Sequence, residues 1–528
     1  MIKLVQAIFV LGLVQQALVV PTIDIKLVTS LRQKPTVNII ISMKESPTLV
    51  LNQLEKQTFQ SREDRLNTFG KTLKDFCSKS QKNVLQLLKE QESVKSLQIS
   101  IFWITNQIAV RGADLELVQE LAALSDISKI EEEFFLELDA PHDLKVVDNL
   151  GKANEEEFQW GVEQIEAPRV WNSGNKGQGI IVATIDTGVR HTHEALRDSF
   201  VGDYGWYDPF FKTLIPNDTH GHGTHTTAII AGRARNIGVA PGAQWASCKG
   251  CDVMFCSQID LFVCGHWVAC PSLADGSAED CSKAPHVVSN SWGGGRGNTW
   301  YRSVIEYYHS VRIVPVFSSG NSGPECGSVS SPGDYENVLG VGATTLENKV
   351  SNFSSAGPTV IGERVKPDVA APGTNIFSAY ASSDTAYASM SGTSMAAPHV
   401  AGAVALMLAE SPDLVYSDIK AALENGVVPT GSSGLNCGGI PDGTFPNHHV
   451  GYGRINAFNS LRTLLHTRTF FTFYIKPSLR IFQSLGGSHY VANFSRCYSS
   501  QIIMNDGFCI NKKIPVQIGS CPCSFQIF

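Results

Sequence analysis

Three absences narrow the function of this 528-residue chain. After residues 1–20 no apolar run is long enough to span a membrane, so no membrane partner is expected. Charge is nearly balanced, with 42 Lys and Arg against 49 Asp and Glu and a net charge of -7. That balance gives no reason to expect a nucleic-acid partner. The His-Glu-x-x-His motif of zinc protease helices is also missing, which removes the best-known sequence signal for a metalloprotease.

The N-terminus and the cysteines both indicate export. Residues 1–20 combine Lys3 with an apolar stretch at 4–14 and are predicted to be a secretory signal peptide, with a buried strand or an uncleaved anchor as alternatives. Of the 13 cysteines, eight lie between Cys248 and Cys437. An even set in an oxidising compartment favours disulfides, whose pairing the sequence does not assign. A zinc site at Cys248 and Cys251 is the less favoured interpretation.

Residues 34–138 alternate strand and helix patterns in the order β-α-β-β-α-β, which predicts a small ferredoxin-like α+β domain. The strand patterns are at 37–42, twice within 97–110, and at 127–138; the helical ones are at 62–91 and 115–124. Residues 139–160 are polar and acidic without periodicity, and are predicted to be a linker that is open to proteolysis. Residues 461–528 are basic and carry four cysteines. We interpret them either as an accessory module or as a poorly ordered extension.

Residues 161–460 have a different character, because short runs that are apolar on both faces alternate with helical patterns. The strand-like runs are at 180–185, 287–288, 313–317 and 338–341, and the helical ones at 224–231, 303–311, 395–408 and 417–423. Strands that are apolar on both faces are typical of parallel sheets covered by helices. The prediction is an α/β domain with a mostly parallel sheet and helices on both faces. In such sheets functional residues gather at the carboxyl ends of the strands.

Ser394 is the first candidate for chemistry. It lies in Gly-Thr-Ser-Met-Ala-Ala-Pro-His at 392–399, and the apolar run that continues to Met407 predicts a buried helix. The positive end of the helix dipole favours negative charge beside the serine. Such a charge forms on the oxygen of the tetrahedral intermediate in acyl transfer. The alternative is an ordinary serine at a helix start after a glycine turn.

Three further residues follow predicted strands or precede a predicted helix. Asp186 ends the 180–185 run, His222 begins a helical pattern, and Asn321 follows the 313–317 run. Taken singly, the aspartate and the asparagine are common turn residues. Together with Ser394 they supply an acid, an imidazole, an amide donor and a hydroxyl, which is the set that serine acyl transfer needs.

At this point the sequence resembles the subtilisin-like serine proteases (subtilases). Asp-Thr-Gly at 186–188, His-Gly-Thr-His at 222–225, Ser-Ser-Gly-Asn at 318–321 and the stretch around Ser394 resemble the four signature stretches of the family, in the family's order. The resemblance covers roughly residues 160–460. It implies that Asp186, His222 and Ser394 form the catalytic triad, and that Asn321 forms the oxyanion hole with the Ser394 N–H. Substrate-binding positions implied by the resemblance are Ser291, Trp292, Gly293, Ser319 and Gly320.

The resemblance also implies a life cycle. Residues 34–138 resemble the family's propeptide, an intramolecular chaperone and inhibitor, so we expect a secreted, monomeric endopeptidase that acts on proteins or peptides and cleaves itself within 139–159. No cofactor or metal is expected for the chemistry. A structural calcium ion is possible in the family, but the segment 232–241 is short where many relatives carry a calcium loop. Residues 248–281 resemble an insertion at the cleft rim, and Asn-x-Ser/Thr at 217, 352 and 493 fits a glycoprotein.

Two rival interpretations stay open. One is an inactive subtilase fold that serves as a binding protein. The other is a metal hydrolase that uses His220, His222 and His225. The expected specificity-pocket positions carry no acid, which favours a broad or apolar cleavage preference over a strictly basic one.

Overall fold

The computed structural model describes residues 21–138, 142–147, 158–465, 516–518 and 521–523. The chain divides into two units, Met1–Thr472 and Phe473–Phe528. In the second unit, β20 (Val516–Ile518) pairs with β21 (Cys521–Cys523). The predicted signal peptide, most of the predicted linker and most of the basic tail lie outside the described residues. In the described part of the chain, no helix is long and apolar enough to cross a membrane.

The N-terminal region has the predicted strand and helix order, with a strand and a helix added at its start and a short helix added after the first predicted strand. The strand predicted at 127–138 is in fact two strands, because the first ends at Glu132. Its elements are β1 (Thr22–Ile23), α1 (Ile25–Leu31), β2 (Val37–Met43), α2 (Thr48–Leu54), α3 (Arg62–Ser80), α4 (Lys82–Lys95), β3 (Gln98–Phe102), β4 (Gln107–Ala113), α5 (Leu115–Ala122) and β5 (Ile127–Glu132). The strands form one sheet in the order β1-β5-β2-β4-β3. The predicted helix at 62–91 is in fact two helices that meet at Gln81.

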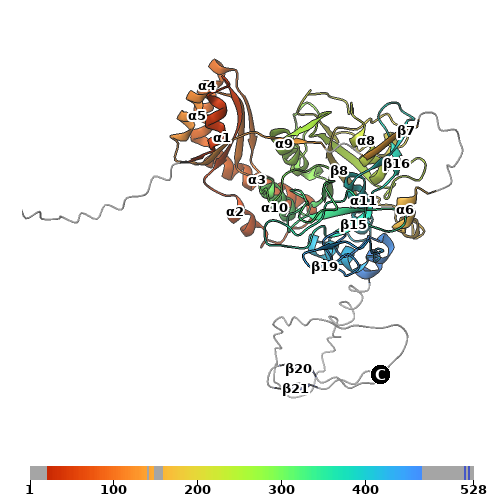
Figure 1. Ribbon diagram of the computed structural model, residues 1–528. Coiled ribbons are helices and arrows are strands. Elements are labelled where there is room, and N and C mark those ends of the chain that lie inside the picture. Colours follow the sequence, from red (N-terminus) through yellow and green to blue (C-terminus); the bar gives the residue numbers. More distant parts are fainter. Residues whose placement is uncertain (1–20, 139–141, 148–157, 466–515, 519–520, 524–528) are drawn as a thin grey trace, which may run out of the picture. The chain divides into compact units, whose positions relative to one another are not determined.

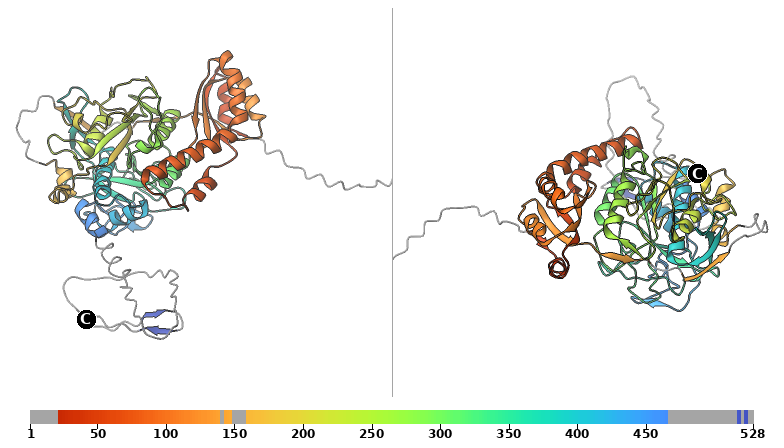
Figure 2. Two further views of the ribbon diagram at one scale, coloured as in Figure 1. Left: turned by 180° about the vertical axis from the view of Figure 1, so that it is seen from behind. Right: turned by 90° about the horizontal axis from the view of Figure 1, so that it is seen from above.

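The two faces of this sheet have different neighbours. Helices α1, α4 and α5 cover one face, where Leu27, Leu88 and Leu117 pack on Ile39 and Ile108 (Figure 1). The other face and α3 share an apolar cluster with the larger domain. Helix α3 extends along that domain (Figure 2). The N-terminal region therefore has its own core on one side and an interface on the other.

The larger domain is built on a seven-stranded sheet in the order β15-β14-β13-β12-β8-β10-β9, with every neighbouring pair parallel. The strands are β8 (Ile181–Asp186), β9 (Trp206–Tyr207), β10 (Gln244–Lys249), β12 (Val287–Asn290), β13 (Val314–Ser318), β14 (Leu339–Thr344) and β15 (Val369–Pro372). This confirms the predicted parallel α/β fold. Strand β8 is an interior strand, with β10 on one side and β12 on the other.

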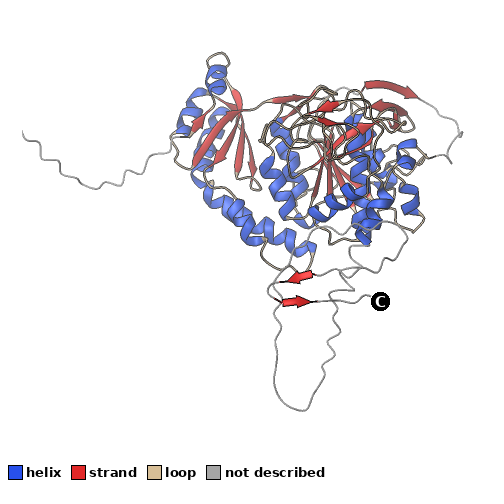
Figure 3. Cartoon of the chain, turned by 60° about the horizontal axis from the view of Figure 1, so that its bottom comes forward, coloured by secondary structure: helices blue, strands red, loops and turns tan. Residues whose placement is uncertain are grey.

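Helices cover both faces of the sheet, as predicted (Figure 3). The helices of this domain are α6 (Trp160–Gln164), α7 (Ala167–Trp171), α8 (His222–Ala231), α9 (Gln258–Ala269), α10 (Arg302–Ser310), α11 (Thr393–Glu410) and α12 (Tyr416–Asn425), with short η1 (Arg197–Ser199) and η2 (Cys281–Lys283). Val182 and Val287 face the cluster that contains α8 and α11. Ala183 and Val288, one residue further along, face α9 and α10. Alternation along each strand therefore builds two cores, one on each face.

Short strands also pair with one another outside the main sheet. They are β6 (Phe135–Glu137), β7 (His142–Val147), β11 (Phe255–Ser257), β16 (Ile376–Ala379), β17 (Tyr387–Ser391), β18 (Asn436–Cys437) and β19 (Ile440–Pro441). Strand β6 pairs antiparallel with β11, and β7 pairs antiparallel with β17. The segment predicted to be an unstructured linker thus contains a paired strand, which its sequence pattern did not indicate.

All eight central cysteines are in disulfides, as predicted. The pairs are Cys248–Cys264, Cys251–Cys256, Cys270–Cys281 and Cys326–Cys437. The zinc interpretation of the first two cysteines is therefore wrong, because both sulfurs are already bonded. Three of the bridges tie the segment around α9 and β11 together. Cys77 in α3 is a free, buried cysteine.

Candidate active site

Asp186 and His222 meet at the carboxyl end of strand β8. Asp186 is the last residue of β8 and His222 is the first residue of α8. His222 Nδ1 lies 2.7 Å from Asp186 Oδ1, and the two side chains are 0% and 2% exposed. The carboxylate therefore accepts a hydrogen bond from the Nδ1–H group. The other ring nitrogen, Nε2, is then the unprotonated, basic one. The site lies at a position in the sheet where later strands of the chain are placed on opposite sides of β8. Functional residues usually lie at such positions in an open α/β sheet.

Two more donors fix the Asp186 carboxylate. The Thr187 N–H donates to Oδ1 at 2.7 Å, and the Thr226 hydroxyl donates to Oδ2 at 3.1 Å. Thr226 lies four residues after His222, on the same face of α8. The sequence reasoning missed Thr226, although its helical spacing from the histidine was a usable signal.

Close backbone approach brings α8 to the end of β8. A Cβ atom on Gly223 would lie 2.1 Å from the carbonyl oxygen of Gly188, so a side chain cannot fit there. Gly221, which precedes the helix, has a φ of 100°, a conformation that glycine adopts without strain. The close backbone approach at Gly223 and the positive φ of Gly221 explain why glycine occupies both positions around His222.

Ser394 lies in the first turn of α11 and faces Ser291. Its hydroxyl donates to the Ser291 carbonyl at 3.4 Å, and the Ser291 hydroxyl donates to the Ser394 carbonyl at 2.9 Å. Ser394 is 4% exposed. The helix behind it is buried over nearly its whole length, as the apolar run predicted. Helix α11 packs on α8, where Met395 and Ile229 share an apolar cluster.

Asn321 is held beside the start of α11. Its Oδ1 accepts from both the N–H and the hydroxyl of Thr393, each at 2.8 Å. Because the oxygen is engaged in this way, the amide Nδ2 is turned toward Gly392, where a Cβ atom would lie 3.5 Å from it. The structure thus brings the predicted amide donor and the predicted nucleophile to the same helix start.

The predicted substrate-binding residues follow two neighbouring strands. Ser291 and Trp292 come after β12 and are 4% and 3% exposed. Ser319 and Gly320 come after β13, and Gly320 has a φ of 103°. Between these two turns is a cavity of about 320 Å³, lined by Gly293, Gly294, Gly295, Arg296, Gly320, Ser322, Ser328 and Ser330. The lining contains no acid and one arginine.

The neighbouring histidines have other partners. His225 is fully buried, its Nε2 lies 3.0 Å from the carbonyls of Ile376 and Ala388, and burial lowers its pKa to about 3. Burial also lowers the pKa of His220. In the described part of the chain, no group of three or more His, Cys, Asp or Glu residues is placed to hold a metal ion. The rival metal hydrolase would need His225 as a ligand, and that ring is already engaged by two carbonyls.

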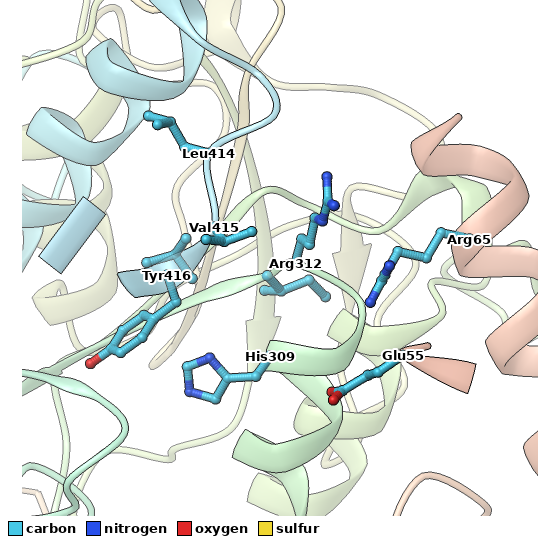
Figure 4. Close-up of a pocket in the computed structure, with 9 residues that line it drawn as sticks. Glu55, Arg65, His309, Arg312, Leu414, Val415 and Tyr416 are labelled. Atoms are coloured by element: carbon cyan, nitrogen blue, oxygen red, sulfur yellow. The ribbon is translucent and has the colours of Figure 1, made fainter. Parts of the chain in front are cut away.

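A second cavity lies away from these residues, at the interface with the N-terminal region. It has a volume of about 290 Å³, and Figure 4 shows Glu55 and Arg65 from one side near His309 and Arg312 from the other. It shares no residue with the site above.

Comparisons with known proteins agree with this geometry. Residues 177–453 match the model of the Subtilase family. The chain is 33% identical over 419 residues to Bacillopeptidase F of Bacillus subtilis (strain 168), a match that covers 74% of this chain and 28% of that protein. It is 34% identical over 268 residues to Thermitase of Thermoactinomyces vulgaris and 32% identical over 284 residues to Subtilisin Savinase of Lederbergia lenta. These two matches cover 87% and 95% of the relative and 51% and 53% of this chain.

Proposed function

The chain belongs to the subtilase family, and on this premise we propose that it is a secreted serine endopeptidase that makes and hydrolyses an acyl-enzyme on Ser394. The observation that carries the proposal is the buried 2.7 Å contact between Asp186 and His222. It gives the imidazole one defined tautomer beside the helix that presents the serine. The match covers 28% of the length of Bacillopeptidase F. The activity of the whole protein is therefore stated as a proposal.

In the proposed reaction His222 Nε2 takes the proton from the Ser394 hydroxyl as its oxygen attacks the peptide carbonyl. Asp186 stabilises the imidazolium that forms. The negative oxygen of the tetrahedral intermediate receives hydrogen bonds from Asn321 Nδ2 and the Ser394 N–H, at the positive end of α11. The imidazolium then gives its proton to the leaving amine, and water enters by the reverse sequence to release the acid.

The N-terminal region is proposed to act as the propeptide, and its last strand supports an inhibitory role. Strand β6 pairs with β11 at the cleft rim, and the Leu136 side chain contacts Gly294, one of the residues that line the 320 Å³ cavity. The next strand along the chain that the structure describes, β7, pairs with β17, which leads into Ser394. The segment proposed to contain the self-cleavage site therefore begins between two strands that are bound to the catalytic domain.

Contacts of the same region with α9 support a role as a folding aid. Glu133 Oε1 accepts from the Ser257 hydroxyl at the N-cap of α9 and from the Ile259 N–H. Arg111 pairs with Asp260 at 2.8 Å, where the aspartate side chain is 3% exposed. A helix start needs partners for its N–H groups, and here a carboxylate from the other domain supplies one.

Cleavage preference is proposed to be broad or apolar. The cavity beside Gly293 and Gly320 offers Arg296 and no carboxylate, so a lysine or arginine side chain would find no counter-ion there. A digest of a diverse peptide mixture, with the cut sites read by mass spectrometry, tests this. A strict preference for cutting after basic residues would contradict it.

The function is tested by replacing the proposed nucleophile in the full chain. Ser394→Ala is expected to leave the precursor uncut and without peptidase activity. The loss known for removing the serine of a subtilisin is about 10⁶-fold in turnover, and we carry that figure over. Intact mass measurement of the secreted protein reads the processing, and a quenched peptide substrate reads the activity. Self-cleavage that continues in this variant would show that Ser394 is not the nucleophile.

A further inference from the structure

A second carboxylate, Asp218, lies in the loop before α8 and binds the start of that helix. Its Oδ2 accepts from the Thr224 N–H at 2.9 Å and from the Thr224 hydroxyl at 2.6 Å. Its Oδ1 accepts from the Gly221 N–H at 2.8 Å and from the His220 N–H at 3.0 Å. These contacts alone would describe an acidic cap for the first turn of a helix.

One more contact shows that Asp218 does more than cap a helix. The Thr187 hydroxyl donates to Asp218 Oδ1 at 3.0 Å, and the same hydroxyl accepts from the Gly223 N–H at 2.9 Å. Thr187 is the residue after Asp186, and Gly223 is the residue after His222. The carboxylate therefore ties together, through a single hydroxyl, the turn that carries the acid and the helix that carries the imidazole.

We propose that Asp218 is a positioning residue that sets the distance and angle between Asp186 and His222. The inference rests on the proposed function and deepens it. Asp218 acts on this pair through Thr187 and Thr224. Catalysis falls steeply when reacting groups are displaced by about 1 Å, so a network that fixes both ends of the 2.7 Å contact controls turnover. Substrate binding depends on other elements and changes little.

The chain offers a matched control for this network. Asp208 is buried, whereas Asp218 is partly exposed. The Asp208 carboxylate accepts from the N–H groups of Phe210 and Phe211, each at 3.0 Å, and from the Thr213 hydroxyl at 2.7 Å. Both aspartates organise loop backbone, but no hydrogen bond of Asp208 reaches β8 or α8 among the described residues. Comparing the two separates general loop stability from positioning.

The main experiment compares Asp218→Asn with Asp208→Asn in the full chain. Asparagine keeps the shape but turns an NH₂ group toward donors that need an acceptor. For Asp218→Asn we expect kcat to fall by about 10- to 100-fold with KM within about twofold of the wild type. For Asp208→Asn we expect kcat within about twofold, even if thermal stability falls as much as in the first variant.

Two further measurements distinguish a positioning effect of Asp218→Asn from misfolding of that variant. In the Ser394→Ala background, the downfield proton resonance of His222 Nδ1 is expected to shift in Asp218→Asn and to stay in place in Asp208→Asn. Thr187→Val removes the linking hydroxyl, and its effect on kcat is expected to be strongly non-additive with Asp218→Asn, because both changes break one network.

The outcomes separate this inference from the proposed function. If the wild-type chain neither cleaves itself nor hydrolyses peptides, the proposed function fails. If the wild type is active but Asp218→Asn retains the wild-type kcat and resonance, Asp218 is only a loop cap and the inference is overturned. Purely additive effects of Asp218→Asn and Thr187→Val would overturn it as well.

Discussion

The candidate active site and the interface with the N-terminal region are held by different kinds of contact. At the site, Asp186 and His222 are buried within one domain, and the donors to the carboxylate come from Thr187, which follows β8, and from α8. At the interface, Lys74 pairs with Glu279 at 2.7 Å with both side chains about one third exposed. Exposed ion pairs contribute little to stability, whereas buried hydrogen-bonded charges are costly to disturb. The interface also holds the buried Asp260 carboxylate and an apolar cluster shared by both domains. The site is thus fixed from within one domain, whereas the interface combines buried contacts with exposed ion pairs.

Among changes that keep Ser394, the largest expected effect is at the oxyanion site. Asn321→Ala removes the amide that is proposed to stabilise the oxyanion while Ser394 remains in place. A subtilisin is the case on which the general figure of about 10²–10³-fold in turnover rests, and we carry it over. Steady-state kinetics on the matured enzyme should show this fall in kcat with KM nearly unchanged. A loss confined to KM would place Asn321 in substrate binding instead.

The next effect concerns the buried part of the interface. Arg111→Met keeps the length of the side chain but leaves the Asp260 carboxylate buried without its counter-ion while the two domains are joined. Because Arg111 is 29% exposed, the expected cost to the interface is about 1–2 kcal/mol, less than for a fully buried pair. Peptidase activity should then appear earlier after self-cleavage than in the wild type.

Lys74→Met is the matched control for that change, because the Lys74–Glu279 pair bridges the same two domains in a more exposed position. We expect at most about 0.5 kcal/mol from it. If the two variants released activity at the same time, burial would not be what distinguishes the two ion pairs.

A smaller effect is expected from the donor on α8. Thr226→Val removes the hydroxyl that donates to Asp186 Oδ2 and keeps the branched shape of the side chain. One hydrogen bond to a charged group contributes about 1.5–3 kcal/mol in general, and Asp186 keeps its other partners, so kcat should fall by about 3- to 10-fold. Thr227, the next residue, bonds to Thr184 instead, and Thr227→Val is the control. Equal losses in both variants would indicate damage to the helix rather than to the carboxylate.

The smallest effect is a pH dependence of the interface. Burial would raise the pKa of Glu279, but the hydrogen bonds and charges of His266 and Lys74 lower it to about 2 from the ordinary 4.5. A lowered acid pKa contributes stability that is complete above pH 4.5 and is lost as the pH falls toward 2. Thermal unfolding of the Ser394→Ala precursor should therefore lose stability over this range, and Glu279→Gln should lose less of it. Identical profiles for the two proteins would contradict the assignment.

Much of the fold could be predicted from the sequence because its strands are apolar on both faces. The runs at 180–185 and 313–317 became β8 and β13, and the run after Ser394 became α11. Strand β10 was missed because Gln244–Lys249 ends in polar residues and a disulfide cysteine. Strand β7 was missed because its side chains are exposed and its pairing partner, β17, lies some 240 residues away in the chain.

The residues of the candidate site that lie in sequence motifs could be predicted. The loop residues that hold those motifs in place could not. Asp186, His222, Asn321 and Ser394 follow strands or begin helices, and the structure groups them in two adjacent clusters on α8 and α11. The spacing of Thr226 from His222 places both on one helix face, but the role of Asp218 depends on three-dimensional contacts that sequence spacing does not reveal. The disulfide partners, such as Cys326 with Cys437, likewise required the fold.

The most direct test of the central claim is to treat the matured protein with a fluorophosphonate probe and to locate the adduct by peptide mass spectrometry. The account predicts one adduct, on the Ser394 oxygen, that forms in step with loss of peptidase activity and is absent in Ser394→Ala. Peptidase activity that persists with no adduct on Ser394, or with the adduct on another residue, would contradict it.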